Sequence, residues 1–282
     1  MLGVLNALTL SALLVMLASG LALIFGLRGI MNFAHGSLYM LGAYLAYSLA
    51  GPLGFWPSLV VVPAILVVGG ALLEFGVFRP LRKRSDLDLA LITYGLSLVI
   101  GQVLILIYTG NTLPVQAPSA LSGTVHLLGV QYPSYRLLII GIGLSTVLAL
   151  FAWLKWTRTG LFVRAVSHDR DTAHMVGVDA RRIGLLVVCM STALAGLAGV
   201  LAGPYIAVQP GMGDSIMISS LVIIAIGGLG SIGGAIVAAV LIGVASSLGE
   251  QFIPSVATLL PYILLIVILA RRPQGFGGAR PA

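Results

Sequence analysis

MLGVLNALTLSALLVMLASGLALIFG (residues 1–26) contains no charged side chain and only a few polar ones. A membrane-spanning helix needs roughly 20 predominantly apolar residues, and this stretch is long enough to form one. It has no basic region at its start and no cleavage site of small residues, and it exceeds the roughly 7–15 apolar residues of a signal peptide. We therefore expect it to be retained as the first membrane span.

The same pattern continues along all 282 residues, of which 59% are hydrophobic and 8% charged. A soluble chain carries about 25% charged residues, and the mean hydropathy here is +1.11. Apolar runs occur at about 4–27, 33–50, 56–78, 89–108, 136–156, 184–206, 215–229, 231–249 and 255–270. We predict one all-α domain over residues 1–282, a polytopic transmembrane bundle of eight or nine spans. Because the run 215–229 is short and ends in glycines, it could be re-entrant together with part of 231–249.

The net charge of +7 could indicate nucleic acid binding, but the basic residues lie at the ends of apolar runs. We therefore expect membrane lipid around the chain and no nucleic acid. If all nine runs cross, 14 of the 15 basic residues fall on one side, and Arg136 is the exception. Basic residues favour the cytoplasmic side, so we predict a cytoplasmic C-terminus and an outside N-terminus. The basic residues on the predicted inner side are Arg28, Arg79, Arg82, Lys83, Arg84, Lys155, Arg158, Arg164, Arg170, Arg181, Arg182, Arg271, Arg272 and Arg280.

Residues 28–37 (RGIMNFAHGS) interrupt an otherwise apolar stretch. Asn32 and His35 would be costly facing lipid. One interpretation is a broken helix beside a translocation path, and the other is a tight inner turn in which Asn32 caps the next helix. His35 alone is either a hydrogen-bonded structural histidine or a proton carrier. The candidate path residues here are Asn32, Phe33, His35, Gly36 and Tyr39.

A second candidate region is IGGLGSIGG, residues 226–234. Residues 228–233 match the dinucleotide pattern GxGxxG, but that pattern requires a βαβ unit, and here it lies between two membrane runs. Small residues let membrane helices approach closely, so these glycines either pack helices or line the path. The candidates are Gly227, Gly228, Gly230 and Gly233.

The longest polar segment on the predicted inner side is TRTGLFVRAVSHDRDTAHMVGVDARRI, residues 157–183. It is typical of one or two short amphipathic helices, with Leu161, Ala165 and His168 on one face. It is either a solvated interfacial loop or a docking surface for a soluble partner. On the outer side, the loop 109–135 is rich in Pro, Gly, Ser and Thr and could hold short strands.

Few residues suggest chemistry. Glu74, Asp214 and Glu250 are isolated acids, which we place near the ends of their spans, where they could reach water. The sequence has no HExxH, CxxC or GxxxxGK[ST] motif and no nucleophile–base grouping, so we expect no catalytic residue, metal or cofactor and no enzyme activity. The single cysteine, Cys189, lies in an apolar run and is expected to be a buried small residue.

Taken together, GLALIFGLRGIMNFAHGSLYMLGAYLAY (20–47), FGVFRPLRKRS (75–85), the segment 157–183 and AIGGLGSIGGAIVAAVLIG (225–243) resemble LivH-type permeases, in the same order and over nearly the whole chain. These are membrane subunits of bacterial ABC importers for branched-chain and related hydrophobic amino acids. The chain lacks the long N-terminal region of many LivM-type partners, which favours the LivH type. Arg28 departs from the residue expected in many relatives.

The resemblance implies a multi-pass protein of the bacterial inner membrane. Its partners would be a LivM-like second permease, two cytoplasmic ATPase subunits and a periplasmic substrate-binding protein. It also implies that residues 157–183 form the coupling loop that docks on an ATPase. The matching positions are Thr157, Arg158, Gly160, Arg164, Ala165, Asp169, Ala173 and Gly177.

Three alternatives remain open at this point. The chain could be a permease of the same family for urea or short amides. It could also be a stand-alone secondary transporter or channel, which the polar residues Asn32 and His35 would support. A membrane enzyme acting on lipids is the third alternative, and the lack of a metal cluster or nucleophile–base grouping argues against it.

Overall fold

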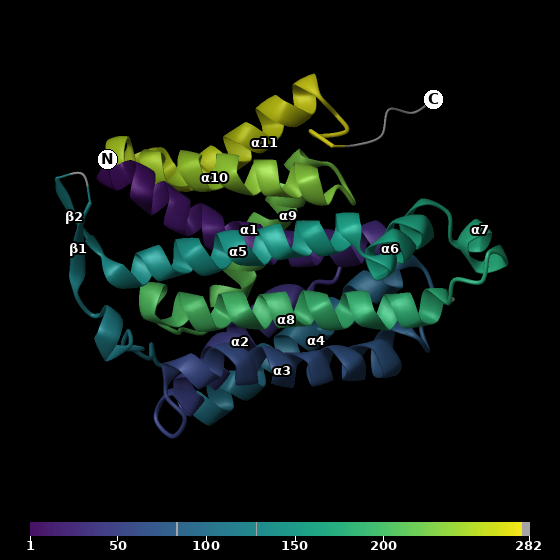
Figure 1. The fold of residues 1–282 in the computed structure, drawn as a ribbon, viewed down its shortest axis with the longest axis horizontal. Coiled ribbons are helices and arrows are strands. Elements are labelled where there is room, and N and C mark those ends of the chain that lie inside the picture. Colours follow the sequence, from purple (N-terminus) through teal and green to yellow (C-terminus); the bar gives the residue numbers. More distant parts are fainter. Residues whose placement is uncertain (83, 128, 278–282) are drawn as a thin grey trace.

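The computed structural model describes residues 1–82, 84–127 and 129–277, so Lys83 and Arg280 lie outside the described residues. The described part is predominantly helical, as predicted, with one short hairpin (Figure 1). The α-helices are α1 Leu2–Arg28, α2 Ala34–Ala50, α3 Phe55–Leu73, α4 Asp86–Tyr108, α5 Ser134–Trp156, α6 Arg158–His168, α7 Arg170–Met175, α8 Ala180–Ile206, α9 Met212–Gly227, α10 Ile232–Phe252 and α11 Leu260–Arg271. A π-helix, Glu74–Phe78, continues α3, and 3₁₀ turns cover Ser119–Leu121 and Pro254–Leu259.

Among the described residues, seven helices are long and apolar enough to cross a bilayer. They are α1, α3 with its π-helix, α4, α5, α8, α10, and α11 with the preceding 3₁₀ turn. The helices α2 and α9, of 17 and 16 residues, are shorter. Together these nine elements correspond to the nine apolar runs of the sequence, which confirms a multi-pass helical membrane protein. The helix α10 has full length, so of the proposed re-entrant pair only α9 is short.

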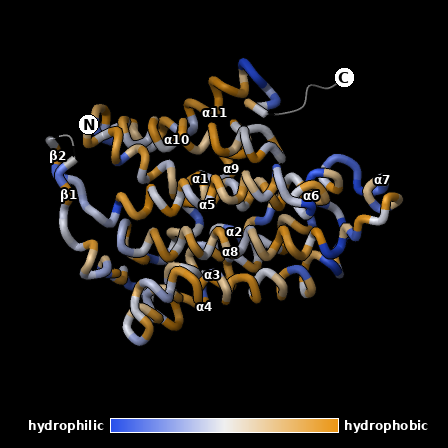
Figure 2. Tube along the Cα trace, in the orientation of Figure 1, coloured by the Kyte–Doolittle hydropathy of each residue, from blue (hydrophilic) through white to orange (hydrophobic). Residues whose placement is uncertain are grey.

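The N-terminus and the hairpin lie at one end of the bundle, while α6, α7 and the end of α11 lie at the other (Figure 1). The hairpin pairs β1, Thr124–Leu127, with β2, Val130–Pro133, in antiparallel register, which confirms short strands in the loop 109–135. Polar residues concentrate at the two ends and apolar residues between them (Figure 2). This distribution fits a bundle inserted lengthwise through a bilayer.

The core is built around α1 and α8, the two most buried of the long helices. The helices α4 and α11 lie at the periphery and leave most of their side chains exposed. In a membrane this arrangement is stable because lipid accepts apolar side chains, whereas polar backbone groups must be satisfied inside each helix.

The chain contains two units of similar architecture, α1–α2–α3 and α8–α9–α10. The first helix of each has 27 residues, and α1 and α8 run in opposite directions (Figure 1). The spacing within the two units also agrees, because the gap between the end of α2 and the start of α3 is as long as the gap between the end of α9 and the start of α10. Each first helix packs against the third helix of the other unit: Ser11 donates to the carbonyl of Val240, and Thr192 donates to that of Leu66. This is the arrangement of an inverted-topology repeat, which is common in transporters.

Candidate translocation path and coupling surface

The helix α2 begins inside the bundle and not at its inner end. Gly29, with a φ of +70°, ends α1, and residues 29–33 are non-helical. His35, in the first turn of α2, lies beside the middle of α1, where its Nε2 is 3.1 Å from the carbonyl oxygen of Leu17. The segment 29–33 therefore runs back along the last turns of α1 before α2 starts.

Protein groups satisfy much of the backbone at this break. Asn32 is fully buried, and its Oδ1 accepts a hydrogen bond from the Ala34 N–H at 3.1 Å, as a capping residue does. Its side-chain nitrogen has no partner among the described residues. The Phe33 N–H donates to Thr93 Oγ1 of α4 at 3.2 Å. The site thus combines features of both sequence interpretations: Asn32, just before the N-cap residue Phe33, binds the first N–H of α2, and the helix begins at membrane depth.

His35 is only 1% exposed and connects three helices. Its Nε2 contacts α1, and its Nδ1 lies 3.4 Å from Ser191 Oγ of α8. A Cβ on Gly20 would lie 3.2 Å from the His35 ring, so the glycine provides the space that the ring occupies. This geometry supports a structural histidine, because a proton carrier needs access to water or to a chain of titratable groups.

Two glycines allow α2 and α9 to cross in backbone contact. A Cβ on Gly36 would overlap the carbonyl oxygen of Gly213, and a Cβ on Gly213 would lie 2.8 Å from the carbonyl oxygen of Gly36. Tyr39, one turn further along α2, is buried with its carbonyl oxygen against Gly199 of α8. Gly36 and Tyr39 are therefore packing positions in this structure.

The glycine-rich segment forms the tight turn between α9 and α10. Gly228 and Gly230 have φ values of +92° and +82°. A Cβ on Gly227 would lie 2.5 Å from the Ala235 nitrogen, and one on Gly26 of α1 would lie 3.0 Å from the Gly230 carbonyl oxygen. Gly26, Gly227 and Gly230 thus allow close backbone approach, and Gly228 allows the left-handed turn, whereas a Cβ on Gly233 would meet no atom of the described residues within 4 Å.

The segment 157–183 forms two short helices, α6 and α7, as predicted. Thr157 caps α6, because its Oγ1 accepts the Gly160 N–H at 3.0 Å. A Cβ on Gly160 would lie 2.6 Å from Leu154 Cα, so only glycine permits α6 to turn so closely beneath α5. Arg158 and Arg164 are exposed, and Ala165 is half-buried.

The buried side of α6 lies beside the face that carries Leu161, Ala165 and His168. Its buried residues are Gly160, Val163 and Val166. Leu161 is 53% exposed, and His168 is also exposed. The helix packs through its smaller side chains, because α5 lies too close above it to accommodate larger ones.

The helix α7 presents apolar side chains at the tip of the loop. Asp169 caps it by accepting the N–H groups of Asp171 and Thr172, and the hydrogen bonds from Thr172 hold the pKa of Asp169 below its ordinary value. Gly177, with a φ of +86°, ends the turn after α7, and Ala173 is buried. Met175 and Val176 are 78% and 73% exposed. These two side chains make the tip of α7 a candidate interaction surface.

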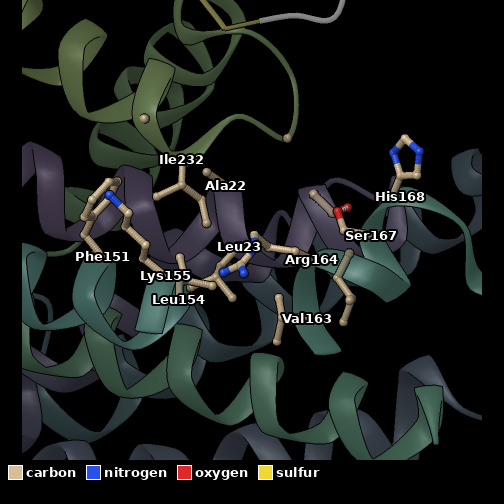
Figure 3. A pocket seen from close by; sticks show the side chains of 14 residues that line it. Ala22, Leu23, Phe151, Leu154, Lys155, Val163, Arg164, Ser167, His168 and Ile232 are labelled. Carbon is tan, nitrogen blue, oxygen red and sulfur yellow. Dashed lines mark hydrogen bonds between the residues drawn. The ribbon is translucent and has the colours of Figure 1, made fainter. Parts of the chain in front are cut away.

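The two candidate regions meet at a hollow of about 620 Å³ between α1, α5, α6 and α10 (Figure 3). Gly230 and Gly233 line it from one side and Lys155 and Arg164 from the other. Ser167 of α6 donates to the carbonyl of Gly26, which ties α6 to the end of α1. A displacement of α6 would therefore act directly on α1 and on the α9–α10 turn.

A buried ion pair was not anticipated from the sequence. We expected Glu74 to reach water near the inner end of its span, but it is 1% exposed and pairs with Arg28, while Arg79 Nε lies 3.5 Å from its second oxygen. The π-helix at Glu74–Phe78 turns this carboxylate inward. Arg28, noted as a departure from the family pattern, also stacks over the Phe78 ring. Arg79 is close to Glu74 along the chain, but the local sequence contains no signal for the pairing with Arg28, because Arg28 lies on a separate helix.

A family model described as the branched-chain amino acid transport system permease component matches residues 3–269. The chain belongs to this family. Membership of the branched-chain amino acid permease family confirms the resemblance noted in the sequence.

Among its relatives is the high-affinity branched-chain amino acid transport system permease protein BraD of Pseudomonas aeruginosa, 28% identical, with 97% of this chain and 94% of BraD covered. The permease LivH of Escherichia coli is 25% identical over the same shares. The probable LivH of Methanocaldococcus jannaschii is 30% identical, with 97% and 91% covered. None of these names supports the urea, stand-alone transporter or lipid-enzyme alternatives.

Two further similarities bear on assembly and fold. LivM of Escherichia coli is 31% identical over 123 residues, which is 43% of this chain and 27% of LivM. The structure of PsaBC from Streptococcus pneumoniae in complex with Fab shares the fold, with a TM-score of 0.50, 18% identity and coverage of 95% of this chain and 91% of that chain.

Proposed function

We propose that this chain is the LivH-type permease subunit of an ABC importer and forms part of the pathway for branched-chain or related hydrophobic amino acids. The observation that carries the proposal is the family match over residues 3–269. The relatives named for branched-chain amino acid transport, each covering 97% of the chain, support the substrate class.

In this proposal, residues 1–282 form one permease domain in the bacterial inner membrane, with α6, α7 and the C-terminus on the cytoplasmic side. Of the described arginines and lysines, all but Arg136 belong to the end that carries α6 and α7. Basic residues favour the cytoplasmic side, which supports this orientation. A LivM-like chain completes the pathway, as the similarity to LivM suggests. A periplasmic protein delivers the substrate. ATP hydrolysis belongs to two partner subunits, so this chain is not itself an enzyme.

The proposed mechanism is alternating access driven through α6 and α7. ATP binding closes the ATPase dimer and moves the two short helices docked on it. Because α6 is tied to α1 by Ser167 and shares a hollow with the α9–α10 turn, its displacement reorients the helices of both units. The ATPase thereby favours one facing state over the other, which is the requirement for coupling.

The decisive experiment is purification of the tagged chain from native membranes in mild detergent. We expect a Walker-A ATPase and a second permease to accompany it. Replacing Met175 and Val176 with Glu should reduce the recovered ATPase about tenfold or more, because central apolar contacts dominate such interfaces. The second permease should remain, since both residues are exposed and outside the core.

The matched control is Leu53→Glu, because Leu53 is 47% exposed but lies at the opposite end of the bundle. This variant should retain both partners. Recovery of the chain alone, under conditions that preserve a known ABC complex, would contradict the importer proposal. Full ATPase recovery with the double variant would remove α7 from the docking surface.

A further inference from the structure

Asp214 lies near the middle of the bundle's length, although we expected it near the outer end of a span. It belongs to the first turn of α9 and follows Gly213, which crosses α2 at Gly36. The neighbouring His35 contacts Leu17, in the middle of α1. The start of α9 is therefore at the depth of the middle of α1, a membrane-spanning helix.

The side of α9 that carries Asp214 is exposed and largely polar. Asp214 and Ser215 are exposed, Ser219 is half-exposed, and Ile218 is 47% exposed. Within residues 1–82, 84–127 and 129–277, the Asp214 carboxylate makes no hydrogen bond or ion pair. None of the described residues therefore pairs with this charge.

A second exposed polar residue lies at the same level. Met40 of α2 lies close to Gly213 of α9, because a Cβ added to this glycine would be 3.3 Å from Met40 Cβ. Met40 also lies close to Gly101 of α4, because a Cβ added there would be 3.8 Å from Met40 Cε. The residues that follow these glycines are Asp214 and Gln102, and both are exposed. Two helices that flank α2 thus carry exposed polar groups in the middle of an apolar bundle.

Lipid cannot be the neighbour of this surface. A charged side chain at the centre of a bilayer costs at least about 2.5 kcal/mol, and such residues face water-filled cavities or partner groups. The exposed residues of α3 at a similar depth show the contrast, because Ile65, Val67 and Val68 are all aliphatic. The polar side of α9 therefore faces water or protein, whereas the exposed side of α3 is suited to lipid.

We propose that Asp214 and Ser215 of α9, together with Gln102 of α4, line the water-filled translocation path, and that the Asp214 carboxylate receives the amino group of the transported amino acid. The identity of the ligand rests on the proposed function. The charge supports it, because an amino acid carries an ammonium group that an unpaired carboxylate attracts. The Ser215 hydroxyl, next along α9, and the Gln102 amide, at a similar depth on α4, can form hydrogen bonds with the passing substrate or with water.

The first test is water access, measured without transport. In the assembled transporter in membranes, with Cys189 replaced by Ser, we would introduce Asp214→Cys and treat it with a membrane-impermeant cationic methanethiosulfonate reagent. The thiol at position 214 should react. The control is Val68→Cys, because Val68 is 59% exposed on the side of α3 that is suited to lipid. Its depth is similar, since Leu66, two residues away, packs against Gly196 near the level of Met40. This thiol should not react. An unreactive thiol at 214 would mean that a partner covers this side of α9 and would overturn the proposal.

The second test is uptake of L-leucine by the complete importer. Asp214→Asn should lower uptake at least about tenfold, because a hydrogen bond to a charged group contributes more than a neutral one, while membrane insertion and ATPase recovery stay normal. Unchanged uptake would overturn the amino-group role. If the importer proposal itself failed, the unsubstituted protein would also take up no leucine, and the uptake test would not apply to Asp214. The thiol labelling would still report whether position 214 faces water.

Discussion

Glu74→Gln should be among the most destabilising single substitutions in this protein. It leaves the Arg28 side chain, which is only 13% exposed, beside Phe78 without its counter-charge and removes the partner of Arg79. Breaking a buried ion pair from one side costs about 3–5 kcal/mol. We expect a clearly lower apparent melting temperature for the purified protein, measured by the loss of its monodisperse peak on heating.

Two controls separate charge from packing in this prediction. The double variant Arg28→Met with Glu74→Leu should recover most of the lost stability, because apolar replacements of a buried pair are often neutral. Asp214→Asn, at an exposed carboxylate without a partner among the described residues, should leave the melting temperature unchanged. If Glu74→Gln melted like the unsubstituted protein, the ion pair would not contribute to stability.

Gly36→Ala should disrupt the crossing of α2 and α9. The added Cβ would overlap the Gly213 carbonyl oxygen, and a backbone atom cannot rotate away as a side chain can. Overpacking of this kind typically costs about 1–3 kcal/mol. Because the two helices must separate, we expect lower yield of folded protein and loss of uptake in cells that express the complete importer.

Gly95→Ala provides the matched control for this substitution. Gly95 lies in α4, and its added Cβ would meet no atom of the described residues within 4 Å. Alanine is the better helix former by about 1 kcal/mol, so this variant should be neutral or slightly more stable. Equal behaviour of the two variants would show that the α2–α9 crossing tolerates a wider separation.

The number and position of the helices could be predicted because hydrophobicity is a local property of the sequence. Each of the nine apolar runs corresponds to one helix, and the polar segment 157–183 forms α6 and α7. The length of α2 also followed from the sequence, but its depth did not. That depth depends on the reversal at Gly29 and on the contact of His35 with Leu17, which are tertiary features.

The difference between local sequence properties and tertiary contacts also explains the errors about individual residues. Glu74 seemed able to reach water because its neighbours along the chain include Arg79, yet the π-helix directs it toward Arg28 on another helix. Asp214 was placed near the outer end because it directly precedes the apolar run 215–229, whereas α9 begins at the middle of the bundle. Amphipathic periodicity grouped residues of α6 on one face, and the side that is buried includes Gly160, where α5 lies close.

The packing of each first helix against the third helix of the other unit has a consequence for biosynthesis. Ser11 in α1 donates its hydrogen bond to Val240, which lies 229 positions later in the chain. At a synthesis rate of roughly 5–20 residues per second, α1 waits for tens of seconds before its main partner exists. A ribosome stalled before α10 would leave α1 in the bilayer without its main packing partner and the Ser11 hydroxyl without the Val240 carbonyl.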